Sequence, residues 1–154
     1  MTTPQQPRQT LIDDMLAIRQ WSQPPPSIDR AEVDSINVIF GDGANVIPTG
    51  IQASVVAHFR ARITGGFLYE FDGITGSINV TIAKAQYSTG GPPTFTGITA
   101  SSPLVISSAR YGENLTLTGW TLDINRGDVL RFSVASVTSL HRVLCALRIR
   151  RLEP

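Results

Sequence analysis

Alternation of apolar and polar residues dominates the chain from Ile36 onward. It is clearest in 119–134, where apolar residues occupy every second position on both sides of a turn at Asn125–Asp128. A period of two predicts strands with one buried and one solvated face, and Asn, Gly and Asp favour the turn. The segment therefore predicts two neighbouring strands of a half-buried antiparallel sheet.

The same alternation recurs along the rest of the chain, with turn signals roughly every 8–12 residues. A long strand is expected from Val55 to Ile63, broken by Gly65-Gly66, and Phe67 starts the next. The inner face of the final strand is Val143, Cys145, Leu147 and Ile149. Roughly eight to ten short strands predict an all-β protein, an antiparallel β-sandwich of jelly-roll type. We expect six residues to be buried together between its sheets: Phe59, Ile78, Val80, Trp120, Phe132 and Val143.

The first 35 residues follow a different pattern. Thr10 offers an N-cap, and the residues after it have helical spacing, which predicts a helix of about three turns. Its apolar stripe is Leu11, Ile12, Met15, Ile18 and Trp21. Pro24–Pro26 ends the helix and predicts a stiff spacer. We therefore divide the chain into an N-terminal attachment arm, residues 1–35, and a β-sandwich domain, residues 36–154.

The predicted helix needs a surface to pack on, because a helix this short is marginal in water. It could fold back onto the β-domain. The proline spacer favours docking on another chain.

The composition points to a chain that is partly covered by partners. Only 16% of the residues are charged and 42% are hydrophobic, and a net charge of +1 predicts no strong attraction to nucleic acid. A surface rich in Ser and Thr would look similar. Lys84 is the one lysine among 13 basic residues. Arginine is favoured at interfaces, although a GC-rich genome gives the same bias.

Two rows of arginine on outer strand faces are the candidate partner-binding residues of the β-domain. The first is Arg60 and Arg62, and the second is Arg148, Arg150 and Arg151. Either they meet acidic surface on another chain, such as a neighbour's segment 29–34, or they form an ordinary solvated face.

No motif predicts an enzyme, a cofactor site or a metal site. His58 and His141 have no cysteine or carboxylate at ligand spacing. Glu70 and Asp72 could act as paired carboxylates, but the turn beside them favours a solvated loop end. Arg126–Asp128 matches an integrin-binding tripeptide, which short turn sequences often do by chance. The single cysteine, Cys145, permits no intramolecular disulfide and is expected in the core.

Four segments of the β-region carry a resemblance to a known class of protein. They are Gly119–Thr121, Gly127–Val134, Ser136–Ser139 and the C-terminal Leu147–Arg151. Together they resemble the C-terminal β-domains of tailed-bacteriophage virion proteins, which occur in tail fibres, head fibres and capsid-decorating proteins. The resemblance extends from about Ile36 to Arg151 and implies a homotrimer.

The resemblance and the arm together imply a virion structural protein, most simply a capsid-decorating (cement or head-fibre) protein. Its partners would be copies of itself and, through residues 1–35, the major capsid protein or another virion protein. The alternative is a receptor-binding module of a tail fibre whose loops, such as Ser88–Pro93, contact host saccharide. No apolar run is long enough to span a membrane and no signal peptide is recognisable, so we expect assembly into the virion in the host cytoplasm.

Overall fold

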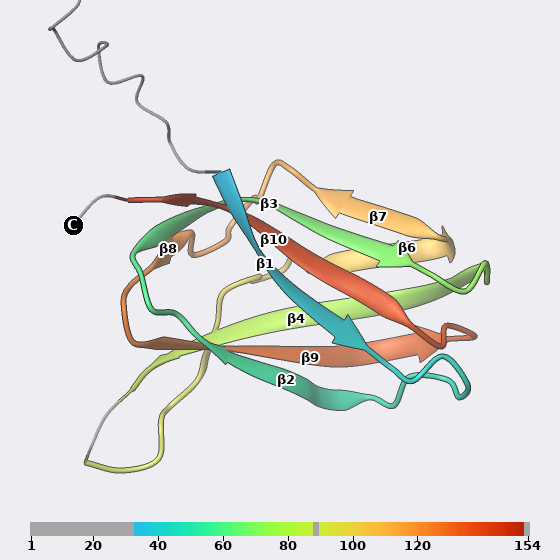
Figure 1. Ribbon diagram of the computed structural model, residues 1–154, viewed down its shortest axis with the longest axis horizontal. Helices are drawn as coiled ribbons and strands as arrows, with labels where there is room; N and C mark the ends of the chain where they lie inside the picture. The colour runs from blue at the N-terminus through green and yellow to red at the C-terminus, as the bar shows by residue number, and fades with distance from the viewer. Residues whose placement is uncertain (1–32, 88–89, 153–154) are drawn as a thin grey trace, which may run out of the picture. The chain divides into compact units, whose positions relative to one another are not determined.

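The computed structural model describes residues 33–87 and 90–152, and the predicted helix and proline spacer lie outside them. In this part of the chain two antiparallel sheets of five strands each enclose one hydrophobic core (Figure 1). The predicted all-β class and β-sandwich architecture are therefore confirmed.

Strands from distant parts of the chain alternate between the two sheets. Sheet A contains β1 (Val33–Phe40), β10 (Val143–Arg151), β3 (Ala61–Glu70), β7 (Tyr111–Asn114) and β8 (Asp123–Ile124). Sheet B contains β2 (Gly50–Val56), β9 (Asp128–Thr138), β4 (Gly76–Gln86), β5 (Thr96–Gly97) and β6 (Leu104–Ala109). Because β1 begins at Val33, the last three residues assigned to the arm lie in sheet A.

The strand pairs are nested in sequence. β1 pairs with β10, β2 with β9, β3 with β7 and β8, and β4 with β5 and β6, always antiparallel. This is the pattern of one long antiparallel ribbon whose successive pairs lie alternately in sheet A and sheet B. Where the chain crosses from one sheet to the other, the connecting loop lies at an end of the sandwich.

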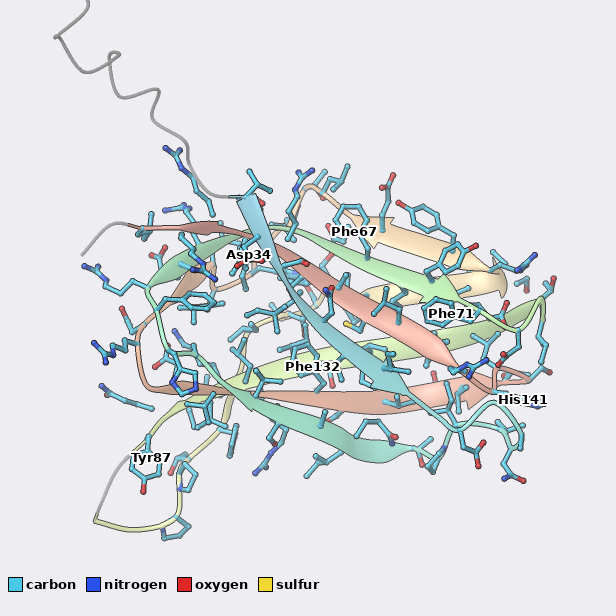
Figure 2. All side chains as sticks on the ribbon, viewed as in Figure 1. Asp34, Phe67, Phe71, Tyr87, Phe132 and His141 are labelled. Atoms are coloured by element: carbon cyan, nitrogen blue, oxygen red, sulfur yellow. The ribbon has the colours of Figure 1, made fainter. Side chains whose placement is uncertain are left out.

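The core lies between the sheets and is centred on Phe132. This side chain, labelled in Figure 2, is fully buried. Its ring centroid is 6.5 Å from that of Phe40 on the opposite sheet. Of the six predicted core residues, five are buried: Ile78, Val80, Trp120, Phe132 and Val143. Phe59 is only partly buried, because it lies where the chain crosses between the sheets and carries the Arg151 guanidinium 4.4 Å from its ring centroid.

The predicted pairing within 119–134 is wrong. β8 pairs with β3 in sheet A, whereas β9 pairs with β2 and β4 in sheet B. The turn between them crosses from one sheet to the other, and the Asp128 carboxylate holds it by accepting a hydrogen bond from the Asn125 amide at 2.8 Å. Alternation reports which face is buried and does not identify the partner strand.

The long strand predicted over Val55–Ile63 is also wrong. β2 ends at Val56 and β3 begins at Ala61, in the other sheet. Gly65-Gly66, predicted to break the strand, lies inside β3 instead. A Cβ on Gly66 would lie 2.5 Å from Leu104 Cδ2, so this glycine makes room for core packing from sheet B.

Replacing Phe132 with Ala is expected to lower the free energy of unfolding by about 3–5 kcal/mol, because the change leaves a cavity at the centre of the core. The measurement is urea unfolding of the full chain. Tyr87→Ala is the control, since Tyr87 is 67% exposed, and it should cost far less. Equal costs for the two changes would contradict this assignment of the core.

Gly112→Ala is expected to destabilise the sandwich by about 1–3 kcal/mol. Its Cβ would lie 1.9 Å from the Val105 carbonyl oxygen, where β7 of sheet A approaches β6 of sheet B backbone to backbone. Gly97→Ala is the control, because a Cβ on Gly97 meets nothing within 4 Å. Thermal unfolding of both variants tests the contact, and a Gly112→Ala variant as stable as the wild type would refute it.

Candidate partner-binding surfaces

The two predicted arginine rows form one cluster in the structure. The antiparallel register of β3 and β10 places Arg62 beside Arg150, and Arg148 lies two residues further along β10 on the same face of sheet A. Arg60 immediately precedes β3 and is also exposed. The sequence could not unite the rows because they are far apart along the chain.

Neighbouring groups of the same chain engage part of this arginine cluster. Arg62 lies 3.6 Å from the Asp123 carboxylate, and the Arg148 Nε donates to the Thr64 hydroxyl at 3.3 Å. Asp34, which we expected to face a neighbouring chain, forms an ion pair with Arg151 of its own chain. The Ser35 amide and then Arg151 hydrogen-bond to Asp34 and lower the pKa of its carboxyl.

A group of large apolar side chains adjoins the arginine cluster on the outer face of sheet A, where the Arg148 guanidinium carbon lies 5.8 Å from the Phe67 ring centroid. Cross-strand register aligns Ile39, Leu144, Tyr69 and Tyr111 in one row. Phe67 and Phe71, labelled in Figure 2, lie on β3 and just after it. We call these six residues the apolar face. Ile39 is 60% exposed and Tyr69 and Tyr111 are each 47% exposed. The sequence analysis did not identify this surface.

Local contacts organise the apolar face. The Tyr69 and Phe71 rings pack edge to face with centroids 5.6 Å apart. The Tyr111 hydroxyl donates to Glu113 Oε2 at 2.5 Å, and this hydrogen bond raises the pKa of the phenol. Because Glu113 satisfies the hydroxyl, Tyr111 presents its ring to solvent as an apolar group.

The outer face of sheet B has a different character. Its central strands place small side chains outward, where Thr81 lies opposite Ser133 and Ala83 lies opposite Arg131. The Arg131 guanidinium carbon lies 3.5 Å from the Phe95 ring centroid. Sheet B thus presents a mostly small and polar outer surface, and sheet A presents the apolar face.

Glu70 and Asp72 are structural groups. Glu70 is fully buried, so the predicted solvated loop end is wrong for this residue. Its carboxylate accepts hydrogen bonds from the Asp72 and Ile74 amides and from Arg110 Nε, and so fixes the turn between β3 and β4. Asp72 pairs with Arg142. Each carboxylate therefore has its own arginine partner.

The Arg126–Asp128 tripeptide turns its carboxylate inward. Asp128 is only 3% exposed, and its Oδ2 lies 3.3 Å from the Lys84 ammonium. Lys84 also donates to the Asp123 carbonyl at 2.7 Å. An integrin-type receptor needs an accessible carboxylate, so this geometry favours a purely structural turn.

Other reactive side chains are dispersed. His58 lies near the start of β9 and His141 lies just after its end, so the strand separates them. Within 33–87 and 90–152 no three or more of the histidine, cysteine and acidic residues cluster as a metal site would require. Burial raises the pKa of the Cys145 thiol to about 12, which keeps it protonated.

Searches of protein-family models and of curated proteins found no match to this chain. The portion that the structure describes contains no helix long and apolar enough to cross a membrane.

Lys84→Met is expected to destabilise the domain by about 3–5 kcal/mol, because it leaves the Asp128 carboxylate buried without its counter-charge. Arg62→Met removes a pair with Asp123 in which both side chains are more than half exposed, and should cost under about 1 kcal/mol. Urea unfolding of both variants provides the comparison. A Lys84→Met effect as small as the control would show that the buried pair contributes little.

Proposed function

We propose that the chain is a structural protein of a tailed-bacteriophage virion, most simply a capsid-decorating (cement or head-fibre) protein. In this proposal it self-associates as a trimer and attaches through residues 1–35. The sequence segments that resemble virion β-domains fall in or beside strands β8, β9 and β10. These strands contribute to both sheets, so the resemblance involves elements on both sides of the core.

The nested strand pairing is the observation that carries the proposal. From the antiparallel ribbon whose pairs alternate between two sheets, with orders β1-β10-β3-β7 and β2-β9-β4-β5 and with β6 also pairing β4, we infer a sandwich of the jelly-roll type. Jelly rolls recur in viral capsid proteins and in lectins. This support is an analogy at the level of the fold, so the function has to be tested on particles.

The attachment arm joins the β-domain at the edge of sheet A. Val33, the first residue of β1, lies opposite Arg150 in the arginine cluster. Each of Leu11, Met15, Ile18 and Trp21 would contribute roughly 1.5–3 kcal/mol on burial, which ordering costs of about 1–2 kcal/mol per residue largely offset. One arm would bind weakly, whereas three arms on a trimer would bind firmly through avidity.

The second candidate function is a receptor-binding module of a tail fibre. Its support is Tyr87, which is 67% exposed at the start of the loop that leads to Pro93. Exposed aromatic rings in loops suit stacking on sugars. Residues 88 and 89 of the loop proposed to contact saccharide lie outside the described part of the chain.

We propose no enzymatic activity for the chain. The arginine partners of Glu70 and Asp72 support this, because they occupy the only carboxylate pair that the sequence offered for general acid–base chemistry. Hydrolysis of host surface polysaccharide by the purified chain would overturn it.

Antibody labelling of purified phage particles tests the proposed function directly. The particles come from the phage or prophage whose genome carries the coding sequence, and they are viewed by electron microscopy. Label on the capsid surface is the expected result. Label on the fibre tips would contradict capsid decoration and support the receptor-binding alternative. Particles without the protein would contradict both functions.

Removing the arm is expected to abolish attachment and leave the β-domain folded. The truncated chain should begin at Ala31, because β1 starts at Val33. Circular dichroism checks its fold, and co-sedimentation with particles that lack the protein measures its binding. Binding equal to that of the full chain would contradict the role of the arm.

A further inference from the structure

We propose that the apolar face of sheet A is the surface through which copies of this chain pack against one another. The inference rests on the self-association that the proposed function includes. It does not depend on where in a virion the protein lies.

The apolar face is large and continuous enough to need a partner. Directly opposed side chains on neighbouring strands lie about 5 Å apart, so the row from Ile39 to Tyr111 leaves no polar gap between strands. Several of its side chains are about half exposed although each is large and apolar. A continuous apolar patch of this kind is typical of an interaction surface.

The charges around this face favour a partner that is close to neutral. Arg142, next to the face, pairs with Asp72, and the Glu113 carboxylate accepts from the Tyr111 hydroxyl. With a net charge of only +1, a second copy of the chain adds little repulsion. Arg148 borders the face, with its guanidinium carbon 5.8 Å from the Phe67 ring centroid, whereas Arg62 and Arg150 lie further along β3 and β10.

The dimensions of sheet A fit copies of itself. Two copies of one sheet have the same twist, which is the condition for aligned packing of sheets at about 10 Å. Four strands spaced about 4.8 Å apart make a face roughly 19 Å wide. Three such faces that close a triangular prism lie about 5.5 Å from its axis, close to half the sheet-packing distance. The width of sheet A therefore suits the proposed trimer.

The outer face of sheet B supplies the control variant for the experiment below. Its exposed apolar residues, Ile51, Val56 and Val105, lie on β2 and β6, with the small outward side chains of β4 and β9 between them. Val56 is 45% exposed, close to the value for Tyr69, and also lies in a strand. Tyr69→Glu and Val56→Glu are thus matched changes on opposite outer faces.

The test is sedimentation velocity of the full chain and both variants from about 1 to 100 µM. The wild type and Val56→Glu should self-associate, and Tyr69→Glu should raise the dissociation constant roughly 30-fold or more, the effect of losing a hot-spot aromatic. A wild type that is monomeric throughout would overturn the inference. A folded Tyr69→Glu variant that associates as the wild type does would overturn it too.

A second measurement covers the case in which Tyr69→Glu fails to fold. Hydroxyl-radical footprinting of the wild type compares dilute and concentrated protein. Tyr69 and Tyr111 should become protected as copies associate, whereas Tyr87, far from the apolar face in Figure 2, should not. Association without protection of Tyr69 would place the interface elsewhere.

The outcomes separate this inference from the proposed function. If Tyr69→Glu loses association and the protein is absent from virions, the apolar face remains the self-association surface and the virion role is refuted. If the protein is present on virions and Tyr69→Glu associates as the wild type does, the virion role is supported and the apolar face is refuted as the interface.

Discussion

The β-domain depends on a single antiparallel ribbon closing over its own core. Each successive strand pair of the ribbon lies in the sheet opposite the previous pair. Two requirements must therefore be met at the same time. The strands must pair in register, and their inner side chains must meet those of the other sheet. Phe132 and Phe40 meet this second requirement at the centre, where rings from the two sheets approach. The nested register then aligns the outer side chains into the surfaces described above.

Electrostatic interactions in this chain separate into two kinds by depth. The buried carboxylates Glu70 and Asp128 each hold a turn, and each has a basic partner, Arg110 or Lys84. The only lysine in the sequence is thus committed to the fold. The arginine cluster is instead exposed on sheet A, and Arg110, Arg126 and Arg142 are exposed elsewhere on the domain. A compact ammonium suits a confined position beside a carbonyl and a carboxylate, whereas the planar guanidinium suits contacts with other surfaces.

The sequence predicted the fold class and most of the core because alternation measures burial directly. It failed where a decision depended on contacts between distant strands. Gly66 looked like a strand breaker, and only the position of Leu104 explains it as a packing residue. The apolar face escaped notice although Phe67–Tyr69 is apolar on both parities. Such a segment signals a strand buried on two sides, and this signal was available in the sequence.

The nested pairing also determines the order in which the domain can form. The innermost pairs, β4 with β5 and β6, close short loops, whereas β1 pairs with β10 across more than a hundred residues of intervening chain. The entropic cost of closing a loop grows with the number of residues between the paired strands. The innermost strand pairs should therefore form first and the outermost pair last. During synthesis β1 emerges first but must wait for the last strand to leave the ribosome. The β1 edge of sheet A is therefore completed only after β10 has emerged, so a chain that stops short of β10 cannot present a finished domain.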